Sequence, residues 1–354
     1  MREVERVTRA IEFGKPDRVP FFSIIPAISD MFFMTCTPSP DWQPDEGYYP
    51  RLHYLLAVFG NWRPKKPLPL NWASSGKPLQ DEFGCIWQAG SADSIGECMG
   101  HPIKDWSQVD TFRIPDPHRR ERFTTFRRLR KVFAADKFII GDLANGIWER
   151  THFLRGFEQL MVDLVLEPDK VMRLIDRMIN EWYLGLMEMY ARYRCHAVIM
   201  TDDWGSQETL MVSPKTWREI FKPRYKRLID AAHDKGMKFI LHSCGDIRLI
   251  IPDLIEIGLD VLQKDDMECL GLDYLEENVS GKLCLFGPLD LQRVLPKAAP
   301  EDIKREVRRT IKALGQHGGG IMGMIYAQPQ AIDIPWHKFA LMHYYFYKYG
   351  KYPV

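Results

Sequence analysis

A histidine and a cysteine two residues apart, His242 and Cys244, are the side chains whose types and spacing most directly suggest chemistry. They follow the apolar run 237–241, which is typical of a buried parallel strand, so both are expected at its carboxyl end. Two residues apart on an extended chain, they can point to the same side. Imidazole and thiolate are good zinc ligands, and a catalytic zinc needs three protein ligands and one open position. The alternative for so short a motif is a pair of satisfied core side chains.

Two adjacent carboxylates, Asp202 and Asp203, follow the preceding predicted strand at 196–200. On an extended chain they face opposite sides, so one should face the interior of the fold and the other its rim. A buried carboxylate near a like charge can act as an acid or base, whereas near a metal it is a ligand. For Asp203, capping of the following helix is the alternative. Glu149 follows the preceding predicted strand, 138–141, and is a third candidate catalytic carboxylate. An internal ion pair is the alternative for this residue.

Neutral and aromatic groups at the strand ends are candidate substrate contacts. Gln263 ends the predicted strand 259–263, and Trp204 follows the two carboxylates. Tyr326 and Gln328 follow the last predicted strand, 320–325. We predict that these four side chains contact the substrate, although a loop turn is the alternative for the last two.

The elements that must position these residues alternate between strand and helix. An early strand is predicted at 19–25, and six more are predicted at 138–141, 196–200, 237–241, 259–263, 282–287 and 320–325. Amphipathic segments predict the helices 153–166, 168–194, 214–235, 247–257, 300–314 and 335–349. Six strand–helix alternations and the early strand predict a (β/α)8 TIM-type barrel with its chemistry at the carboxyl ends of the strands.

Residues 26–117 lack this regular pattern, because proline and glycine interrupt it while tryptophans recur. We interpret this segment as an irregular cap over the barrel mouth, with its aromatic side chains lining a pocket. A satellite core under irregular loops is the alternative for any single tryptophan. The whole chain, 1–354, is then a single domain.

Composition excludes several classes of function. The formal net charge is +1, so no overall attraction to nucleic acid or to an anionic membrane is expected. No stretch approaches the roughly 20 apolar residues that span a bilayer, and the charged amino terminus lacks the apolar core of a signal peptide. The seven cysteines show no CxxC pair, which favours reduced thiols in a cytoplasmic protein.

An ordered set of motifs resembles the uroporphyrinogen decarboxylase-like proteins over essentially the whole chain. The matching segments are 12–20, 153–158, 201–205, 213–225, 242–245, 251–255, 287–292 with 300–301, and 318–320. The resemblance implies a (β/α)8 barrel and one of two activities. The decarboxylase itself needs no metal, but its arginine-rich amino-terminal substrate motif is absent here, so a substrate with eight carboxylates would lack its counter-charges. The second activity is that of zinc-dependent, corrinoid-linked methyltransferases, whose His-x-Cys metal motif is matched by His242 and Cys244.

The chain departs from these methyltransferases at the distant third cysteine, because the last strand is followed by Tyr326-Ala327-Gln328. Asp202 or Glu149 is then expected to supply an oxygen ligand, and an oxygen-rich zinc is the better Lewis acid. The resemblance therefore implies a methyltransferase that removes a methyl group from a methylated substrate. We expect this substrate to be a methoxylated aromatic compound. The acceptor would be the Co(I) centre of a separate corrinoid protein, since the Asp-x-His at 116–118 has Glu121 where a cobalamin-binding module has glycine.

Two other functions stay open on the sequence. One is a metal-free decarboxylase of a tetrapyrrole or an aromatic acid, in which Asp202 stabilises a developing positive charge. The other is a non-catalytic subunit that binds a corrinoid protein. Whether the chain forms a homodimer is also left open.

Overall fold

The computed structural model describes residues 1–23, 25–39, 41–42, 78–88, 96–287, 289–292, 294–326 and 332–354. The cap segment predicted at 26–117 is therefore described only in part: residues 43–77, which include Trp62 and Trp72, lie outside the described residues, and so does Gln328.

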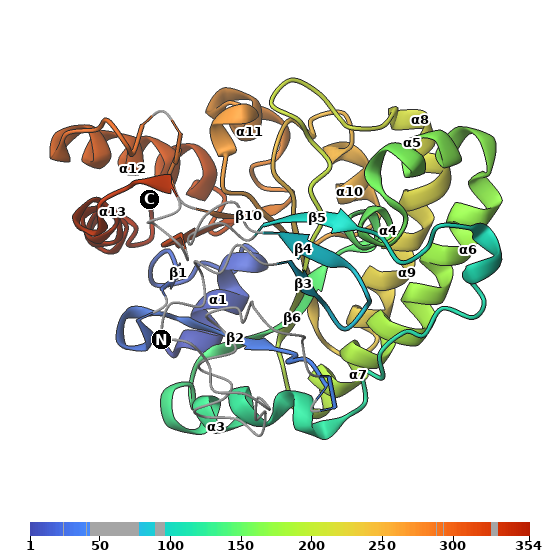
Figure 1. The fold of residues 1–354 in the computed structure, drawn as a ribbon. Coiled ribbons are helices and arrows are strands. Elements are labelled where there is room, and N and C mark those ends of the chain that lie inside the picture. The colour runs from blue at the N-terminus through green and yellow to red at the C-terminus, as the bar shows by residue number, and fades with distance from the viewer. Residues whose placement is uncertain are drawn as a thin grey trace.

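Eight parallel strands form one sheet in the order β1-β11-β10-β9-β8-β7-β6-β2. Its two ends approach each other where the Asp30 N–H, just before β2, donates to the Phe21 carbonyl in β1 at 2.9 Å. The sheet is thus a nearly closed barrel (Figure 1), and the predicted TIM-type fold is confirmed. The strands are β1 (Phe21–Phe22), β2 (Met31–Thr35), β6 (Phe138–Asn145), β7 (Ala197–Thr201), β8 (Lys238–His242), β9 (Val261–Gln263), β10 (Cys284–Gly287) and β11 (Ile321–Met324).

Helices surround the barrel (Figure 1). They are α1 (Glu3–Ile11), α3 (Thr124–Phe133), α4 (Ile147–Arg155), α5 (Phe157–Leu166), α6 (Pro168–Met178), α7 (Leu184–Arg192), α8 (Pro214–Thr216), α9 (Lys222–His233), α10 (Ile251–Glu256), α11 (Leu272–Asn278), α12 (Pro300–Gly315) and α13 (Trp336–Tyr349). The helices predicted at 168–194 and 214–235 each contain a π-helical turn, at Ile179–Tyr183 and Trp217–Phe221. Gly156, at φ +96°, divides the helix predicted at 153–166 into α4 and α5.

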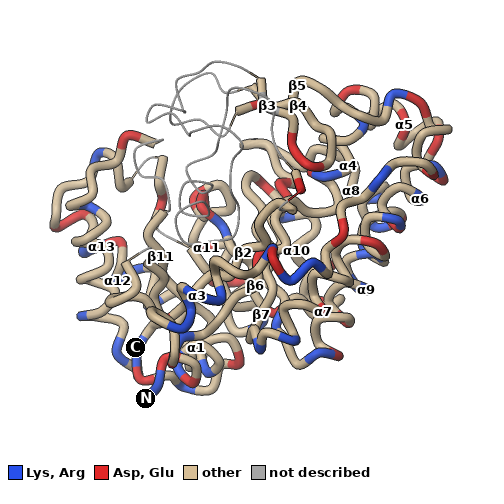
Figure 2. The backbone as a smooth tube through the Cα atoms, turned by 60° about the horizontal axis from the view of Figure 1, so that its bottom comes forward, with Lys and Arg blue, Asp and Glu red and all other residues tan. Residues whose placement is uncertain are grey.

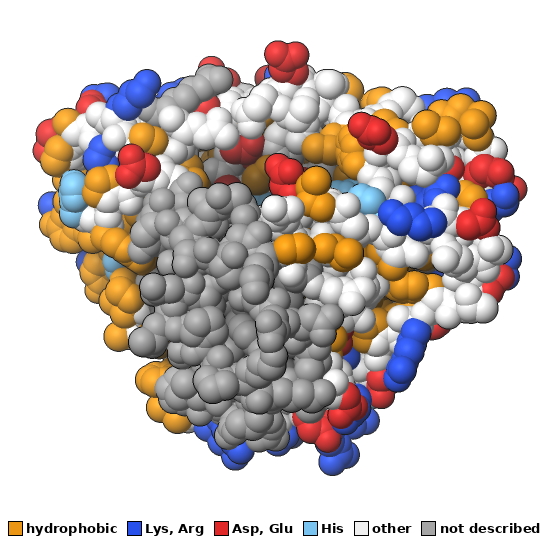
Figure 3. All heavy atoms as spheres, in the orientation of Figure 1, with side chains coloured by type: hydrophobic (Ala, Val, Ile, Leu, Met, Phe, Trp, Pro, Cys, Tyr) orange, Lys and Arg blue, Asp and Glu red, His pale blue; other side chains and the backbone are white. Residues whose placement is uncertain are grey.

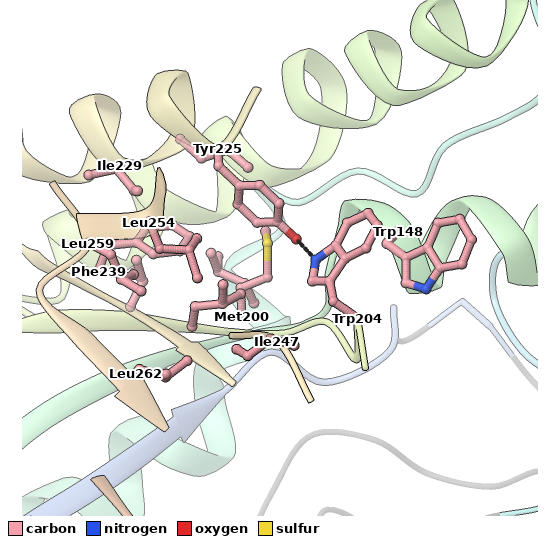
Figure 4. Close-up of a cluster of buried hydrophobic side chains, with 14 of the residues drawn as sticks. Trp148, Met200, Trp204, Tyr225, Ile229, Phe239, Ile247, Leu254, Leu259 and Leu262 are labelled. Atoms are coloured by element: carbon pink, nitrogen blue, oxygen red, sulfur yellow. Dashed lines mark hydrogen bonds between the residues drawn. The ribbon is translucent and has the colours of Figure 1, made fainter. Parts of the chain in front are cut away.

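Two hydrophobic clusters follow from the alternation of side chains along the strands. One fills the barrel interior and joins α1, with members such as Ile140, Ile240 and Phe286. The other packs the outer face of the barrel against the helices; Figure 4 shows Met200, Phe239 and Leu262 of the strands beside Ile229 and Leu254 of the helices. The strands β7 to β11 are buried on both faces over nearly all of their length, which explains why their sequences are almost continuous apolar runs.

The segment predicted as a cap contains a barrel strand. β2 pairs with β6 in register from Met31 with Phe138 to Thr35 with Asp142, so this part of 26–117 belongs to the barrel. A separate antiparallel sheet follows, formed by β3 (Leu79–Gln80), β4 (Ile86–Gln88) and β5 (Glu97–Gly100).

Basic and acidic residues are intermixed along outer helices such as α6, α7 and α9 (Figure 2), as the net charge of +1 suggests. Among the described residues, no helix combines the length and the apolar character needed to cross a membrane.

Candidate metal centre

A cavity of about 1430 Å³ opens where the strands of the barrel end. Its floor is apolar and aromatic: Phe22 of β1 lies 4.7 Å from Phe33 of β2 and 6.4 Å from Phe286 of β10, ring centre to ring centre. Residues of β4, β5, α4 and α5 extend the lining toward solvent. Figure 3 shows a recess on one face of the molecule in which acidic and hydrophobic side chains meet.

Three potential ligands converge on one wall of this cavity. Ligand atoms of Asp203, His242 and Cys244 all lie within 4.8 Å of one another. The His242 Nε2 atom is 3.3 Å from Asp203 Oδ1 and 3.6 Å from Cys244 Sγ. A tetrahedral zinc bound at its usual bond lengths separates nitrogen from oxygen by about 3.3 Å and nitrogen from sulfur by about 3.5 Å. The spacing of the three side chains therefore fits a zinc ion with one open position.

Gln263 sets the orientation of the His242 ring. Its side-chain oxygen contacts His242 Nδ1, while its Nε2 donates to Asp265 Oδ1 at 2.9 Å. Because an amide oxygen only accepts, Nδ1 carries the proton in this contact and Nε2 is left as the ligand nitrogen. A hydrogen bond of this kind on the second ring nitrogen is usual for metal-bound histidines.

Close contacts between the segments after β7 and β8 bring the three ligands together. The backbone N–H of Gly205 donates to the Cys244 carbonyl at 3.2 Å, and the backbone N–H of Cys244 donates to Asp203 Oδ1 at 2.7 Å. Gly245 has φ +76°, and a Cβ there would lie 2.1 Å from the Gly205 oxygen. The backbones of Gly205 and Gly245 thus approach so closely that only glycine fits at position 245.

Glu149 also lines the cavity, but from the first turn of α4 rather than from a strand end. Burial raises its pKa to about 8, and the nearby charges of Asp202 and Asp203 add to this effect. Asn145 Nδ2 donates to Glu149 Oε2 at 2.9 Å. Arg150 bonds to the Asn145 side-chain oxygen instead of pairing with Glu149. A protonated Glu149 is thus held in the lining at neutral pH.

The structure places Asp202 away from the cavity lining. It is fully buried, and its carboxylate accepts the backbone N–H groups of Trp148 at 3.0 Å and Glu149 at 2.7 Å and the Tyr225 hydroxyl. Burial raises the pKa of Asp202 to about 7. The expectation that Asp202 or Glu149 supplies the oxygen ligand is therefore corrected: Asp203 faces His242 and Cys244, and Asp202 caps α4.

Trp204 is also placed elsewhere than predicted. It is fully buried, stacks on Trp148 with 5.0 Å between ring centres, and donates from Nε1 to the Tyr225 hydroxyl at 2.7 Å (Figure 4). It belongs to the core between barrel and helices rather than to the cavity. Gln263 and Tyr326 line the cavity, and their contact with a substrate stays a prediction.

Sequence reasoning missed several polar residues of the lining. Asp142 extends β6 beyond the predicted strand 138–141, and Asp265 lies two residues after Gln263. Burial raises the pKa of both carboxyls. Their position just after apolar runs is the same signal that identified Asp202 and Asp203.

Comparison with known proteins identifies the family. The family model for uroporphyrinogen decarboxylase (URO-D) matches residues 90–325. The chain belongs to the uroporphyrinogen decarboxylase family. Its predicted resemblance to this family and to the methyltransferases in it is confirmed.

Related members of the uroporphyrinogen decarboxylase family include both kinds of enzyme. The chain is 24% identical over 176 residues to the methylated-thiol–coenzyme M methyltransferase of Methanosarcina mazei, covering 50% of this chain and 46% of that relative. It thus spans about half the length of this curated relative. It is 22% identical over 258 residues to the uroporphyrinogen decarboxylase of Actinobacillus pleuropneumoniae, covering 68% of each chain. A solved methyltransferase from Methanosarcina mazei shares the fold, with a TM-score of 0.70, 15% identity and 99% coverage of both chains.

Proposed function

We propose that the chain is a methyltransferase that removes a methyl group from a small methylated donor and passes it to the Co(I) centre of a separate corrinoid protein. The observation that carries this proposal is the convergence of Asp203, His242 and Cys244 on one wall of the cavity. Similarity to a methyltransferase of the same family supports it.

The three side chains would hold the metal, and Gln263 would keep the His242 ring in place. A bound zinc would act as a Lewis acid on the donor heteroatom, which lowers the barrier to breaking its bond to the methyl carbon. One carboxylate and one thiolate neutralise a doubly charged ion, so the donor need not bring a negative charge to the site.

Glu149 is proposed as the proton donor to the leaving group. Asn145 occupies its Oε2 atom, so Oε1 is the oxygen that offers the proton to the cavity. In an ether donor, the carbon–oxygen bond breaks with its electron pair on oxygen, which takes the Glu149 proton. The methyl carbon forms its new bond with the electron pair of the Co(I) acceptor. With its pKa at about 8, Glu149 is in the required protonated form near pH 7.

The charge of the cavity favours particular donors. Among the described residues, only two basic side chains line the cavity, Lys104 and Arg155. The acidic side chains of the lining are Glu97, Asp142, Glu149, Glu158, Asp203 and Asp265. Arg155 is already paired with Asp163 at 2.7 Å. Glu149 is protonated and Asp203 would offset the metal charge, but with only Lys104 and Arg155 as basic side chains the described lining offers few counter-charges to a polycarboxylate such as a tetrapyrrole acid. With the aromatic floor, it favours a methoxylated aromatic donor that is neutral or cationic.

The test begins with zinc content, measured by elemental analysis of the wild type, Cys244→Ser and the matched control Cys269→Ser. About one equivalent of zinc is expected in the wild type and in the control, and a loss in Cys244→Ser. Methyl transfer to Co(I) cobalamin is then followed by absorbance with guaiacol, vanillylamine and vanillate, which carry neutral, positive and negative ring substituents.

We expect transfer from guaiacol or vanillylamine and at least about tenfold slower transfer from vanillate. A wild type that takes up no zinc would contradict the proposed metal centre. Zinc binding without transfer from any methylated donor would contradict the methyltransferase proposal. Preferred transfer from vanillate would contradict only the charge argument.

A further inference from the structure

Two cysteines meet in the small antiparallel sheet at the edge of the cavity. Cys85 lies just before β4 and is fully buried, whereas Cys98 lies in β5 and lines the cavity. Both sulfur atoms contact the Phe153 carbonyl oxygen, at 3.4 Å and 3.6 Å. The two thiols also affect each other's ionisation: the Cys98 thiol raises the pKa of Cys85, and the Cys85 thiol lowers the pKa of Cys98. Cys85 and Cys98 are therefore direct neighbours, one inside the protein and one facing the cavity.

The strand register allows these neighbours to approach further. Trp87 pairs with Cys98 and Ile86 with Gly100, which leaves Met99 as the extra residue of a β-bulge. Cys85 lies two residues before Trp87, so it shares a face of the sheet with Cys98 as a diagonal neighbour. The Cα atoms of diagonal neighbours lie about 7–8 Å apart, and a disulfide needs its Cα atoms within about 6.8 Å, so β5 must move slightly toward Cys85 for the bond to form. Met99 is exposed, so a small movement of β5 at the bulge is sterically open.

The surroundings of Cys98 suit a reactive thiol. The neighbouring Cys85 thiol lowers the pKa of Cys98, and the Cys98 Sγ atom lies 3.7 Å from His101 Nδ1. By contrast, burial raises the pKa of Cys195 to about 12. A thiol that has a lowered pKa, lines the cavity and has a second thiol beside it has the features of a redox-active cysteine.

We propose that Cys85 and Cys98 form a reversible disulfide by exchange with a low-molecular-weight disulfide such as oxidised glutathione. The Cys98 thiolate attacks one sulfur of this oxidant, forming a mixed disulfide and releasing one thiolate. Cys85 then gives its proton to that thiolate and attacks Cys98 Sγ, which releases the second small thiolate. The two protein thiols are oxidised to one disulfide, and the small disulfide is reduced to two thiols.

This modification site is independent of the reaction that the cavity carries out. Because Glu97 and Cys98 of β5 line the cavity together with His101, which follows β5 directly, drawing β5 toward Cys85 changes the edge of the cavity. Oxidation would thus alter access to the cavity without touching the proposed metal ligands.

The test is anaerobic incubation of the full chain with oxidised glutathione, followed by alkylation of the remaining thiols and peptide mapping by mass spectrometry. A cross-linked peptide containing Cys85 and Cys98 is expected in the wild type, and dithiothreitol should restore both thiols. Cys98 should be consumed at least about tenfold faster than the half-buried control Cys269. In Cys85→Ser, Cys98 should stop at the glutathione adduct, whereas in Cys98→Ser, Cys85 should remain free.

Two results would overturn the proposal. One is a wild type in which Cys98 is consumed no faster than the buried Cys195. The other is a wild type in which the glutathione adduct persists on Cys98 while Cys85 remains alkylatable. Both are read from the wild type, so neither depends on the folding of a variant.

Discussion

The His242 ring and the Gln263 side chain share a hydrogen bond that fixes which imidazole nitrogen faces Asp203 and Cys244. Gln263 is itself held by Asp265, so the chain of contacts runs from the end of β9 to the proposed metal centre at the end of β8. A residue predicted as a substrate contact thus has a direct contact with a proposed ligand.

Gln263→Leu should lower zinc affinity by about 10- to 100-fold, because the ring loses the acceptor that fixes its tautomer and orientation. Competition with a chelator of known affinity measures this change, and circular dichroism checks the fold. An unchanged affinity would show that Gln263 does not position the ring. Gln207→Leu, on the loop after β7, is a glutamine control outside the cavity lining.

Asp203→Asn should abolish stoichiometric zinc binding, because the amide is a much poorer ligand than a carboxylate and its charge no longer offsets that of the ion. The measurement is metal content after dialysis against micromolar zinc. Retention of a full equivalent by a folded Asp203→Asn protein would remove this residue from the ligand set.

Asp202→Ala should instead destabilise the fold, by about 2–4 kcal/mol. The buried N–H groups of Trp148 and Glu149 and the Tyr225 hydroxyl would lose their shared acceptor. Urea unfolding of the metal-free proteins measures the difference. Full stability combined with loss of zinc would instead assign Asp202 to the metal centre.

Gly245→Ala should cost roughly 2–4 kcal/mol of stability, since the new methyl group meets the Gly205 backbone in a left-handed conformation. Gly236→Ala is the matched control: it has a similar φ of +71°, but nothing lies within 4 Å of the new Cβ. The control should lose only about 1 kcal/mol. Equal losses in the two variants would mean that the contact between the Gly205 and Gly245 backbones is not tightly packed.

Acid should remove a stabilising contribution from the amino-terminal ion cluster. Hydrogen bonding with Arg6 lowers the pKa of Asp17 from 3.8 to about 2. A lowered folded-state pKa gives stability that is present above the unfolded value and is lost as the pH falls through the folded value. The stability difference between wild type and Asp17→Asn should therefore be constant above about pH 5 and shrink toward about pH 2. Denaturant unfolding across this range tests the sign, and a difference that grows on acidification would contradict it.

The regular half of the barrel was predictable because its strands are apolar on both faces and end in polar residues. The early strand β2 was missed because Met31–Thr35 is a short apolar run within a segment interrupted by proline. The choice between Asp202 and Asp203 was not predictable, since one residue of register decides which side chain faces inward, and β7 ends at Thr201 rather than at Met200. Trp204 was assigned to the cavity by residue type alone, yet the same indole fits a core when a hydroxyl such as that of Tyr225 accepts its N–H.

The pairing of β1 with β11 has a consequence for how the chain acquires its cavity. Phe22 pairs with Met324, and both lie in the cavity lining although some three hundred residues separate them in sequence. Contacts so distant along the chain carry a large loop-closure cost and form late. During synthesis, Phe22 leaves the ribosome long before its partner strand exists. A nascent chain that has already built β6 to β9 would therefore have His242 and Cys244 in place while the aromatic floor beneath them is still open.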